Sequence, residues 1–100
     1  MKTFTCSNAA VTDLHAIANY TVAHFGADHA RHYGEGVEHC FELLAENPHA
    51  GTAMEQICPG LRCFEYRNHS VFYFEKKSGC IIMRVLHHGT QQPRQYYRSE

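Results

Sequence analysis

Apolar positions recur at helical spacing through the first half of the chain. Steps of four, three, four and four separate the members of one stripe: Ala10, Leu14, Ile17, Thr21 and Phe25. This spacing predicts an amphipathic helix over about residues 8–25. Ser7 or Asn8 can cap its start through a side-chain oxygen, and Gly26 supplies the left-handed residue that ends it.

A second helical stripe begins directly after Gly26 and ends before Asn47-Pro48. Its members are Ala30, Tyr33, Val37, Cys40, Phe41 and Leu44. We expect Asp28 to cap this helix, with only Gly26 and Ala27 between it and the first one. Two helices joined so closely fold back on each other, so the pattern predicts an antiparallel helical hairpin.

Gly34 and Gly36 interrupt the second predicted helix. In a helix interior each costs about 1 kcal/mol relative to Ala. Either a partner packs closely at these positions or the helix is locally weak, and the pattern leaves both alternatives open.

The remaining segments have the composition of strands. Residues 3–6 form a short β-rich run, and three longer runs cover 62–67, 71–75 and 80–87. Short turns separate these three, which predicts an antiparallel meander, and the run at 80–87 is apolar on both faces, as in a central strand covered by a helix. Residues 49–61 are expected to form a loop. The elements predict an α+β fold, with an N-terminal strand and a helical hairpin packed on an antiparallel sheet.

The length of 100 residues predicts a single domain over 1–100, with 89–100 as a polar tail. No apolar run approaches the roughly 20 residues of a membrane span, and the N-terminus lacks the apolar core of a signal peptide. We therefore expect a cytoplasmic protein with no membrane partner. The five cysteines are odd in number, and in that compartment they are expected to be reduced, small, buried side chains.

The net charge of −1 conceals an uneven distribution. Residues 1–60 contain two basic and seven acidic side chains, a balance of −5, whereas residues 61–100 contain seven basic and three acidic ones, a balance of +4. The protein is therefore expected to be a dipole, with an acidic helical half and a basic half that can meet an acidic partner.

Arg84 and His87 are set into the apolar run of the last predicted strand, where each needs a partner or a route to solvent. Arg62 and Tyr73 lie on the two preceding strands. These four residues are our candidates for contact with a target or partner. The alternative for Arg62 and Arg84 is a structural bond to an acidic group such as Glu65 or to backbone carbonyls, and for Tyr73 it is a place in the core.

Nine histidines raise the question of a metal site, and His29, His32, Glu35 and His39 are spaced along one helix. Neither a Cys-x-x-Cys pair nor a His-Glu-x-x-His run occurs, and nothing marks one thiol as an activated nucleophile. We therefore expect no metal, no cofactor and no catalytic residue.

A series of short motifs occurs in a fixed order along the chain. It comprises Asp13-Leu14, Tyr20, Phe25-Gly26, Leu43-Leu44-Ala45-Glu46-Asn47-Pro48, Gly51, Pro59-Gly60-Leu61-Arg62, Phe72-Tyr73 and Arg84-Val85-Leu86-His87. No single motif is diagnostic, but together with the order of the elements they resemble the ParE toxin family within the RelE/ParE superfamily. The resemblance covers roughly residues 3–90.

This resemblance implies a toxin of a type II toxin-antitoxin (plasmid stabilisation) system. In that family a ParD-like antitoxin holds the toxin inactive, and the released toxin inhibits DNA gyrase. The resemblance thus implies a binding protein rather than an enzyme, with no sequence-specific binding of nucleic acid by the toxin alone. The family often has an acidic residue shortly after the His87 position, where this chain has Gly89-Thr90-Gln91-Gln92.

Two alternatives stay open. RelE-like toxins of the same superfamily cut mRNA on the ribosome, and here Arg62, Tyr73, Arg84 and His87 would take part. That reaction needs cations and a proton donor or acceptor near the phosphate, and it usually goes with a strongly basic surface, whereas the net charge here is −1. The second alternative is a relative that has lost toxicity and only binds its antitoxin.

Overall fold

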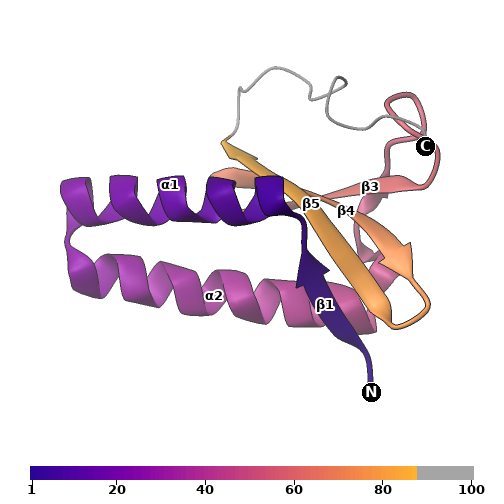
Figure 1. Ribbon diagram of the computed structural model, residues 1–100, viewed down its shortest axis with the longest axis horizontal. Helices are drawn as coiled ribbons and strands as arrows, with labels where there is room; N and C mark the ends of the chain where they lie inside the picture. Colours follow the sequence, from indigo (N-terminus) through magenta and orange to yellow (C-terminus); the bar gives the residue numbers. More distant parts are fainter. Residues whose placement is uncertain (88–100) are drawn as a thin grey trace.

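The structure is a computed structural model that describes residues 1–87. Its elements are β1 (Thr3–Cys6), α1 (Asn8–Phe25), α2 (Ala27–Glu46), the 3₁₀ helix η1 (Pro48–Ala50), β2 (Thr52–Ala53), β3 (Leu61–Tyr66), β4 (His69–Lys76) and β5 (Gly79–His87). Two helices pack on one sheet, which confirms the predicted α+β fold (Figure 1). The tail predicted at 89–100 lies outside the described residues. Within them, the helices are too short or too polar to cross a membrane.

The helical hairpin forms as predicted, with a tighter turn. Ser7 caps α1, because its Oγ accepts a hydrogen bond from the backbone N–H of Ala10 at 3.0 Å. Gly26 alone separates the helices, at a φ of 95° that glycine adopts at little cost. The prediction that Asp28 caps α2 is wrong: α2 already begins at Ala27, and Asp28 forms an ion pair with Arg31 inside it.

The sheet has the strand order β1-β5-β4-β3-β2. Strands β3, β4 and β5 form the expected antiparallel meander. Strand β1 pairs in parallel with β5, so the sheet is mixed, a feature that the strand pattern did not contain. Backbone bonds from Thr3 N to Ser78 O and from Ser7 N to Ile82 O extend this pairing at both ends. The helices and the meander provide the long connection that parallel neighbours require.

Strand β5 contains a bulge that changes which of its side chains face the helices. Val71 and Tyr73, which are two apart on β4, pair with Val85 and Ile82, which are three apart on β5. Met83 is the extra residue, and it shifts the alternation so that Val85 returns to the face that Ile82 occupies. The bulge therefore explains why the apolar run of β5 lacks strict alternation and still forms one continuous strand between β1 and β4.

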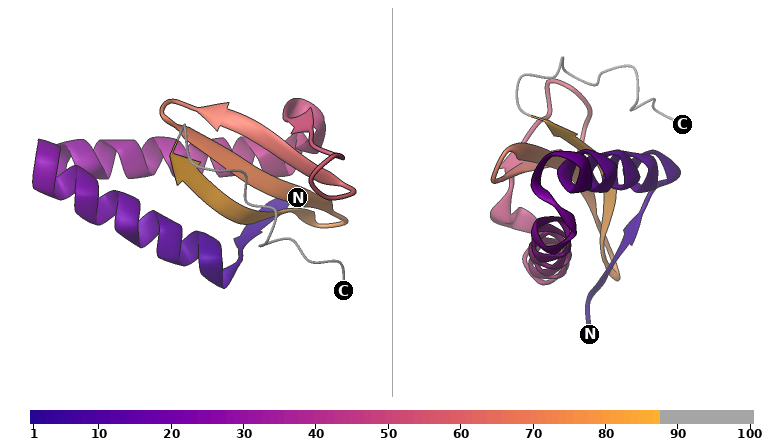
Figure 2. Two further views of the ribbon diagram at one scale, coloured as in Figure 1. Left: turned by 90° about the horizontal axis from the view of Figure 1, so that it is seen from above. Right: turned by 90° about the vertical axis from the view of Figure 1, so that its left-hand side faces the viewer.

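The hairpin lies against one face of the sheet (Figure 2), and the main core lies between the two. The stripe of α2 is buried there as predicted, with Val37, Cys40, Phe41 and Leu44. The stripe of α1 contributes buried Ala10 and partly buried Leu14 and Ile17. Its predicted last member, Phe25, is instead 61% exposed. The closed end of the hairpin projects beyond the sheet (Figure 1), so the sheet does not cover this side chain.

The loop predicted over 49–61 contains two short elements. η1 begins at Pro48, and β2 pairs its two residues with Cys63 and Arg62 of β3. Elements of two or three residues are too short to produce a periodic pattern, so neither could be predicted from the sequence.

Candidate functional site

Arg84 connects the last strand to the first helix through Asp13. Its Nε donates a hydrogen bond to Asp13 Oδ2 at 2.7 Å, and its Nη2 donates to Oδ1 at 2.8 Å, a bidentate arrangement. The backbone N–H of Val85 donates to the same carboxylate at 3.0 Å. The two side chains are only 13% and 12% exposed, so the pair ties α1 to β5 from within. The structural alternative considered for Arg84 is present, with Asp13 rather than Glu65 as its partner.

Arg62 and Tyr73 meet at the turn after α2. The Tyr73 hydroxyl donates to Pro48 O at 2.6 Å and accepts from Gly51 N at 2.8 Å. Arg62 Nη1 donates to Gly51 O at 2.5 Å. Tyr73 is fully buried, and this burial raises the pKa of its hydroxyl, which therefore stays neutral. Both side chains hold the turn at 48–51 in place.

His87 ends β5 and is exposed. Its ring stands edge-on to that of His69, which is its partner residue on β4, with 5.4 Å between the ring centroids. His69 in turn forms a hydrogen bond with the hydroxyl of Tyr33 on α2. Both imidazoles line a cavity of about 520 Å³ near the projecting end of the hairpin, which also includes Tyr20 and Phe25.

The structure thus places the four predicted site residues in three locations. Arg62 and Tyr73 share the turn after α2, Arg84 is tied to α1, and His87 lies at the rim of the cavity beside His69. Contact of these residues with a target or partner stays a prediction.

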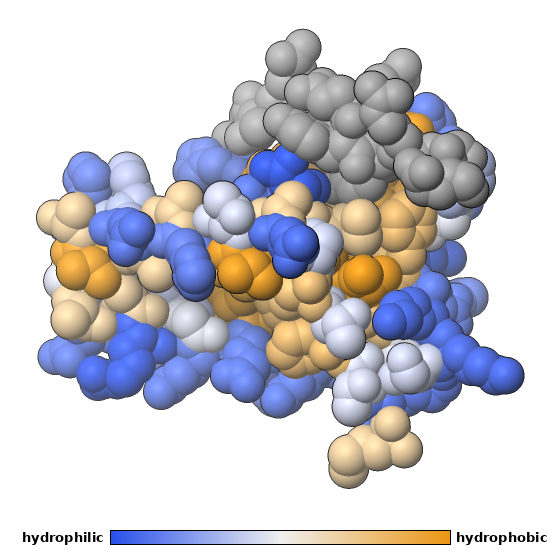
Figure 3. All heavy atoms as spheres, in the orientation of Figure 1, coloured by the Kyte–Doolittle hydropathy of each residue, from blue (hydrophilic) through white to orange (hydrophobic). Residues whose placement is uncertain are grey.

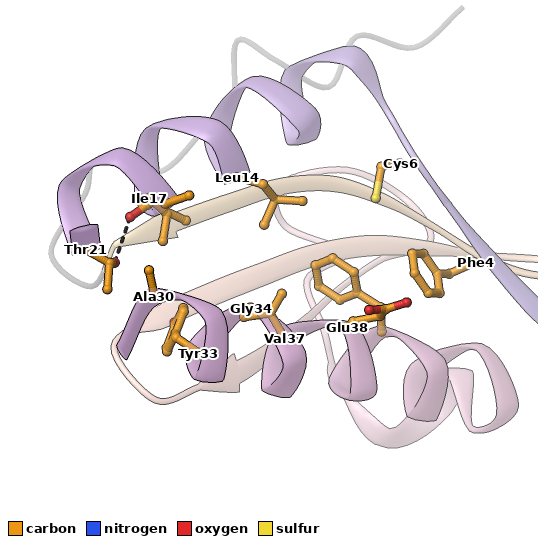
Figure 4. Close-up of a pocket in the computed structure, with 12 residues that line it drawn as sticks. Phe4, Cys6, Leu14, Ile17, Thr21, Ala30, Tyr33, Gly34, Val37 and Glu38 are labelled. Atoms are coloured by element: carbon orange, nitrogen blue, oxygen red, sulfur yellow. Dashed lines mark hydrogen bonds between the residues drawn. The ribbon is translucent and has the colours of Figure 1, made fainter. Parts of the chain in front are cut away.

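An apolar groove lies between the two helices, and we call it the interhelical groove. It encloses about 300 Å³, and Leu14 and Ile17 of α1 point across it toward Tyr33 and Val37 of α2 (Figure 4). Phe4 of β1 closes one end. On the surface, apolar residues form a band between the helices, with hydrophilic residues along both outer edges (Figure 3). An apolar surface of this kind is typical of a site that a partner covers.

Further apolar side chains of the hairpin are exposed outside the main core. They are Val11, Tyr20, Val22, Phe25 and Leu43. Single exposed apolar residues are ordinary, but Tyr20 and Phe25 also line the cavity at the projecting end. The hairpin is therefore the part of the described chain where uncovered apolar surface is concentrated.

The cysteines are free thiols in chemically quiet surroundings. Burial raises the pKa of Cys40 and of Cys80 to about 11. The pKa of Cys63 rises to about 12, through burial first and the neighbouring Glu65 carboxylate second. Such thiols stay protonated at neutral pH and are poor nucleophiles. Among residues 1–87, no group of three or more His, Cys, Asp or Glu side chains is arranged to hold a metal ion.

The sequence matches a family model described as the ParE toxin of the type II toxin-antitoxin system, parDE, over residues 5–92. That range is most of the chain. The chain belongs to the ParE toxin family. Membership of this family makes it the toxin of a type II toxin-antitoxin system, and it implies a ParD-type antitoxin as partner.

Relatives of known name support the assignment to the ParE family. Toxin ParE1 of Mycobacterium tuberculosis (strain H37Rv) is 35% identical over 82 residues, which cover 81% of this chain and 84% of that protein. Toxin ParE1 of Caulobacter vibrioides (strain CB 15) is 32% identical over 87 residues, which cover 87% and 90%. A solved structure described as the chromosomal ParDE TA system from P. aeruginosa has the same fold, with a TM-score of 0.71 and 24% identity over 87% of this chain and 96% of that chain.

Sequence reasoning missed two features of this ParE toxin. The first is the role of Asp13, although a signal was present: it is the one Asp, Glu, Lys or Arg within α1. A carboxylate that has no basic residue on its own helix can pair with a cation elsewhere in the chain. Arg84, which lies within an apolar strand, needs such an acidic partner. The second is the interhelical groove. Gly34, for which the sequence pattern leaves a closely packed partner open, lines this groove.

Proposed function

We propose that this ParE toxin acts by binding DNA gyrase, and that a ParD-like antitoxin neutralises it by occupying the interhelical groove. The observation that carries the antitoxin part is the groove itself, an apolar surface between two helices that is open in the free chain. A segment that covers it removes apolar area from water, which is the main driving force of association.

The target part is supported by how the candidate residues are used. A toxin that traps an enzyme on DNA needs shape and a few charges, but no proton transfer. Arg84 is held by the Asp13 carboxylate, and the Tyr73 hydroxyl is engaged by two backbone groups of the turn after α2. We propose that His87 contacts the target or antitoxin directly and that Arg62 does so as well, while its guanidinium also donates to Gly51 O of the turn. Tyr73 and Arg84 hold the surface in shape.

The ribonuclease alternative needs a phosphate clamp together with a general acid or base. Within residues 1–87, the local set for this chemistry is Arg62, Arg84 and His87, and these lie at separate places on the sheet. The net charge of −1 also gives little drive to bind ribosomal RNA. Both observations favour the gyrase reading. We further propose that the chain is one domain acting in the cytoplasm, where gyrase is present.

Purified toxin should cause gyrase-dependent DNA cleavage to accumulate on plasmid DNA and should leave messages on translating ribosomes intact. Cleavage products on an agarose gel and primer extension on mRNA from a translation extract measure the two outcomes. The variant His87→Ala tests whether this histidine is needed for either activity. The residue is exposed, so the substitution should leave the core intact. The contrary result is a toxin that cuts mRNA, with His87→Ala abolishing the cutting without changing the melting temperature of the protein. That result would replace the gyrase hypothesis with the ribonuclease hypothesis. A toxin that is inert in both assays but binds its antitoxin is the non-toxic relative.

A further inference from the structure

Two glycines interrupt α2, and packing within the described chain accounts for one of them. Gly36 is covered by Tyr66, whose hydroxyl lies too close to leave room for a Cβ at this position. Gly34 is different: outside its own helix backbone and chain neighbours, a Cβ there would meet no atom within 4 Å. Glycine in a helix interior is unfavourable relative to alanine, so the stability of the free toxin gives no reason for Gly34.

Gly34 lies in the wall of the interhelical groove, opposite the face of α1 that carries Ile17 (Figure 4). Ala30, one helical turn earlier in the same wall, is also small. Between the larger side chains of Tyr33 and Val37, Gly34 therefore leaves this wall without a side chain, and Ala30 adds only a methyl group before Tyr33. The groove therefore has a notch at Gly34 that a side chain from another molecule can enter.

Glu38 lies one turn after Gly34 on the same wall. It is exposed, and within residues 1–87 it has neither an ion-pair nor a hydrogen-bond partner. Helix α2 as a whole contains five acidic residues and one basic residue, a balance of −4 with His neutral. The charge beside the notch is therefore negative, which favours a basic group on whatever occupies the groove.

We propose that Gly34 receives one large apolar side chain of the antitoxin, and that Glu38 pairs with a Lys or Arg about one helical turn from that anchor. This inference rests on the proposed binding of the antitoxin in the interhelical groove. It specifies that the segment bound there is basic and amphipathic. The anchor in the notch supplies affinity through burial, and the charge pair sets the position of the segment along the groove.

Filling the notch tests the proposal. Calorimetric titration of the purified toxin with the ParD-like product of the adjacent reading frame should show antitoxin affinity reduced about 10- to 100-fold by Gly34→Leu, because the anchor and the new side chain cannot both fit. Gly34→Ala should raise the melting temperature of the free toxin and still weaken antitoxin binding. A higher melting temperature together with a lower antitoxin affinity would show that the groove is blocked and that the fold is intact.

Two further variants complete the test. His32→Leu changes a nearby exposed residue of α2 that does not line the groove and is not part of its negative charge, and it should keep wild-type affinity. Glu38→Gln should weaken binding and reduce its dependence on salt concentration, because it removes one charge pair. Unchanged affinity for Gly34→Leu and Gly34→Ala, with wild-type toxin bound normally, would overturn the notch and leave antitoxin neutralisation standing. If wild-type toxin fails to bind the antitoxin, the proposed function itself is wrong.

Discussion

Replacing Asp13 by Ala should destabilise this ParE toxin by about 3–5 kcal/mol, the range for breaking a largely buried ion pair from one side. The Arg84 guanidinium would lose the carboxylate that neutralises it in a place where its side chain is only 13% exposed. The backbone N–H of Val85 would lose its acceptor as well. Urea denaturation followed by circular dichroism measures the loss as a lower midpoint.

Two matched variants identify the cause of that loss. Asp13→Asn keeps the size and one acceptor oxygen but removes the charge, so its loss should be smaller. The double variant Asp13→Leu with Arg84→Met removes both charges and should recover much of the stability, because apolar side chains of similar size can replace a buried pair. A midpoint that Asp13→Ala leaves unchanged would mean that the pair does not tie α1 to β5.

Replacing Leu44 by Ala should cost about 2–5 kcal/mol, from lost transfer energy and from the cavity left behind. Leu44 is completely buried and lies where the stripe of α2 meets the sheet. Thermal unfolding should show a clearly lower melting temperature.

Leu43 provides the control for this prediction, because it is the same residue type one position earlier on the same helix. It is 43% exposed, so Leu43→Ala should cost less than about 1 kcal/mol. Equal losses for the two variants would show that the buried face of α2 is misassigned.

The helices could be predicted because each carries an apolar stripe long enough to show its period. The stripe of α2 ends in the core at Leu44, as its spacing indicates. The prediction that Phe25 is buried at the end of the stripe of α1 is wrong, because a stripe does not show where the sheet beneath the helix ends. The parallel pairing of β1 could not be predicted, since a strand pattern gives no direction and no neighbour. The bulge at Met83 was also beyond the pattern, because it depends on the match between two strands.

The candidate site was predictable in part. An Arg within an apolar strand predicts that Arg84 needs a partner, and the structure confirms this. The partner lies 71 positions away on α1, and the sequence does not show which acidic residue folding brings beside Arg84. The strand pattern predicts that Tyr73 and Arg62 lie on neighbouring strands. It does not predict that both bond the turn after α2, because the residues of that turn, Pro48 and Gly51, belong to a segment without a periodic pattern. The interhelical groove forms only when the facing sides of α1 and α2 come together in the folded chain. The sequence of either helix alone therefore does not predict it.

The most direct test of the account is gyrase supercoiling of relaxed plasmid with purified toxin, followed by titration with the purified ParD-like antitoxin. The account predicts that toxin alone stops supercoiling and that an excess of antitoxin restores it, because an antitoxin that fills the interhelical groove is proposed to hold the toxin inactive. Undiminished supercoiling by a toxin preparation that arrests cell growth would contradict the account and move the target away from gyrase.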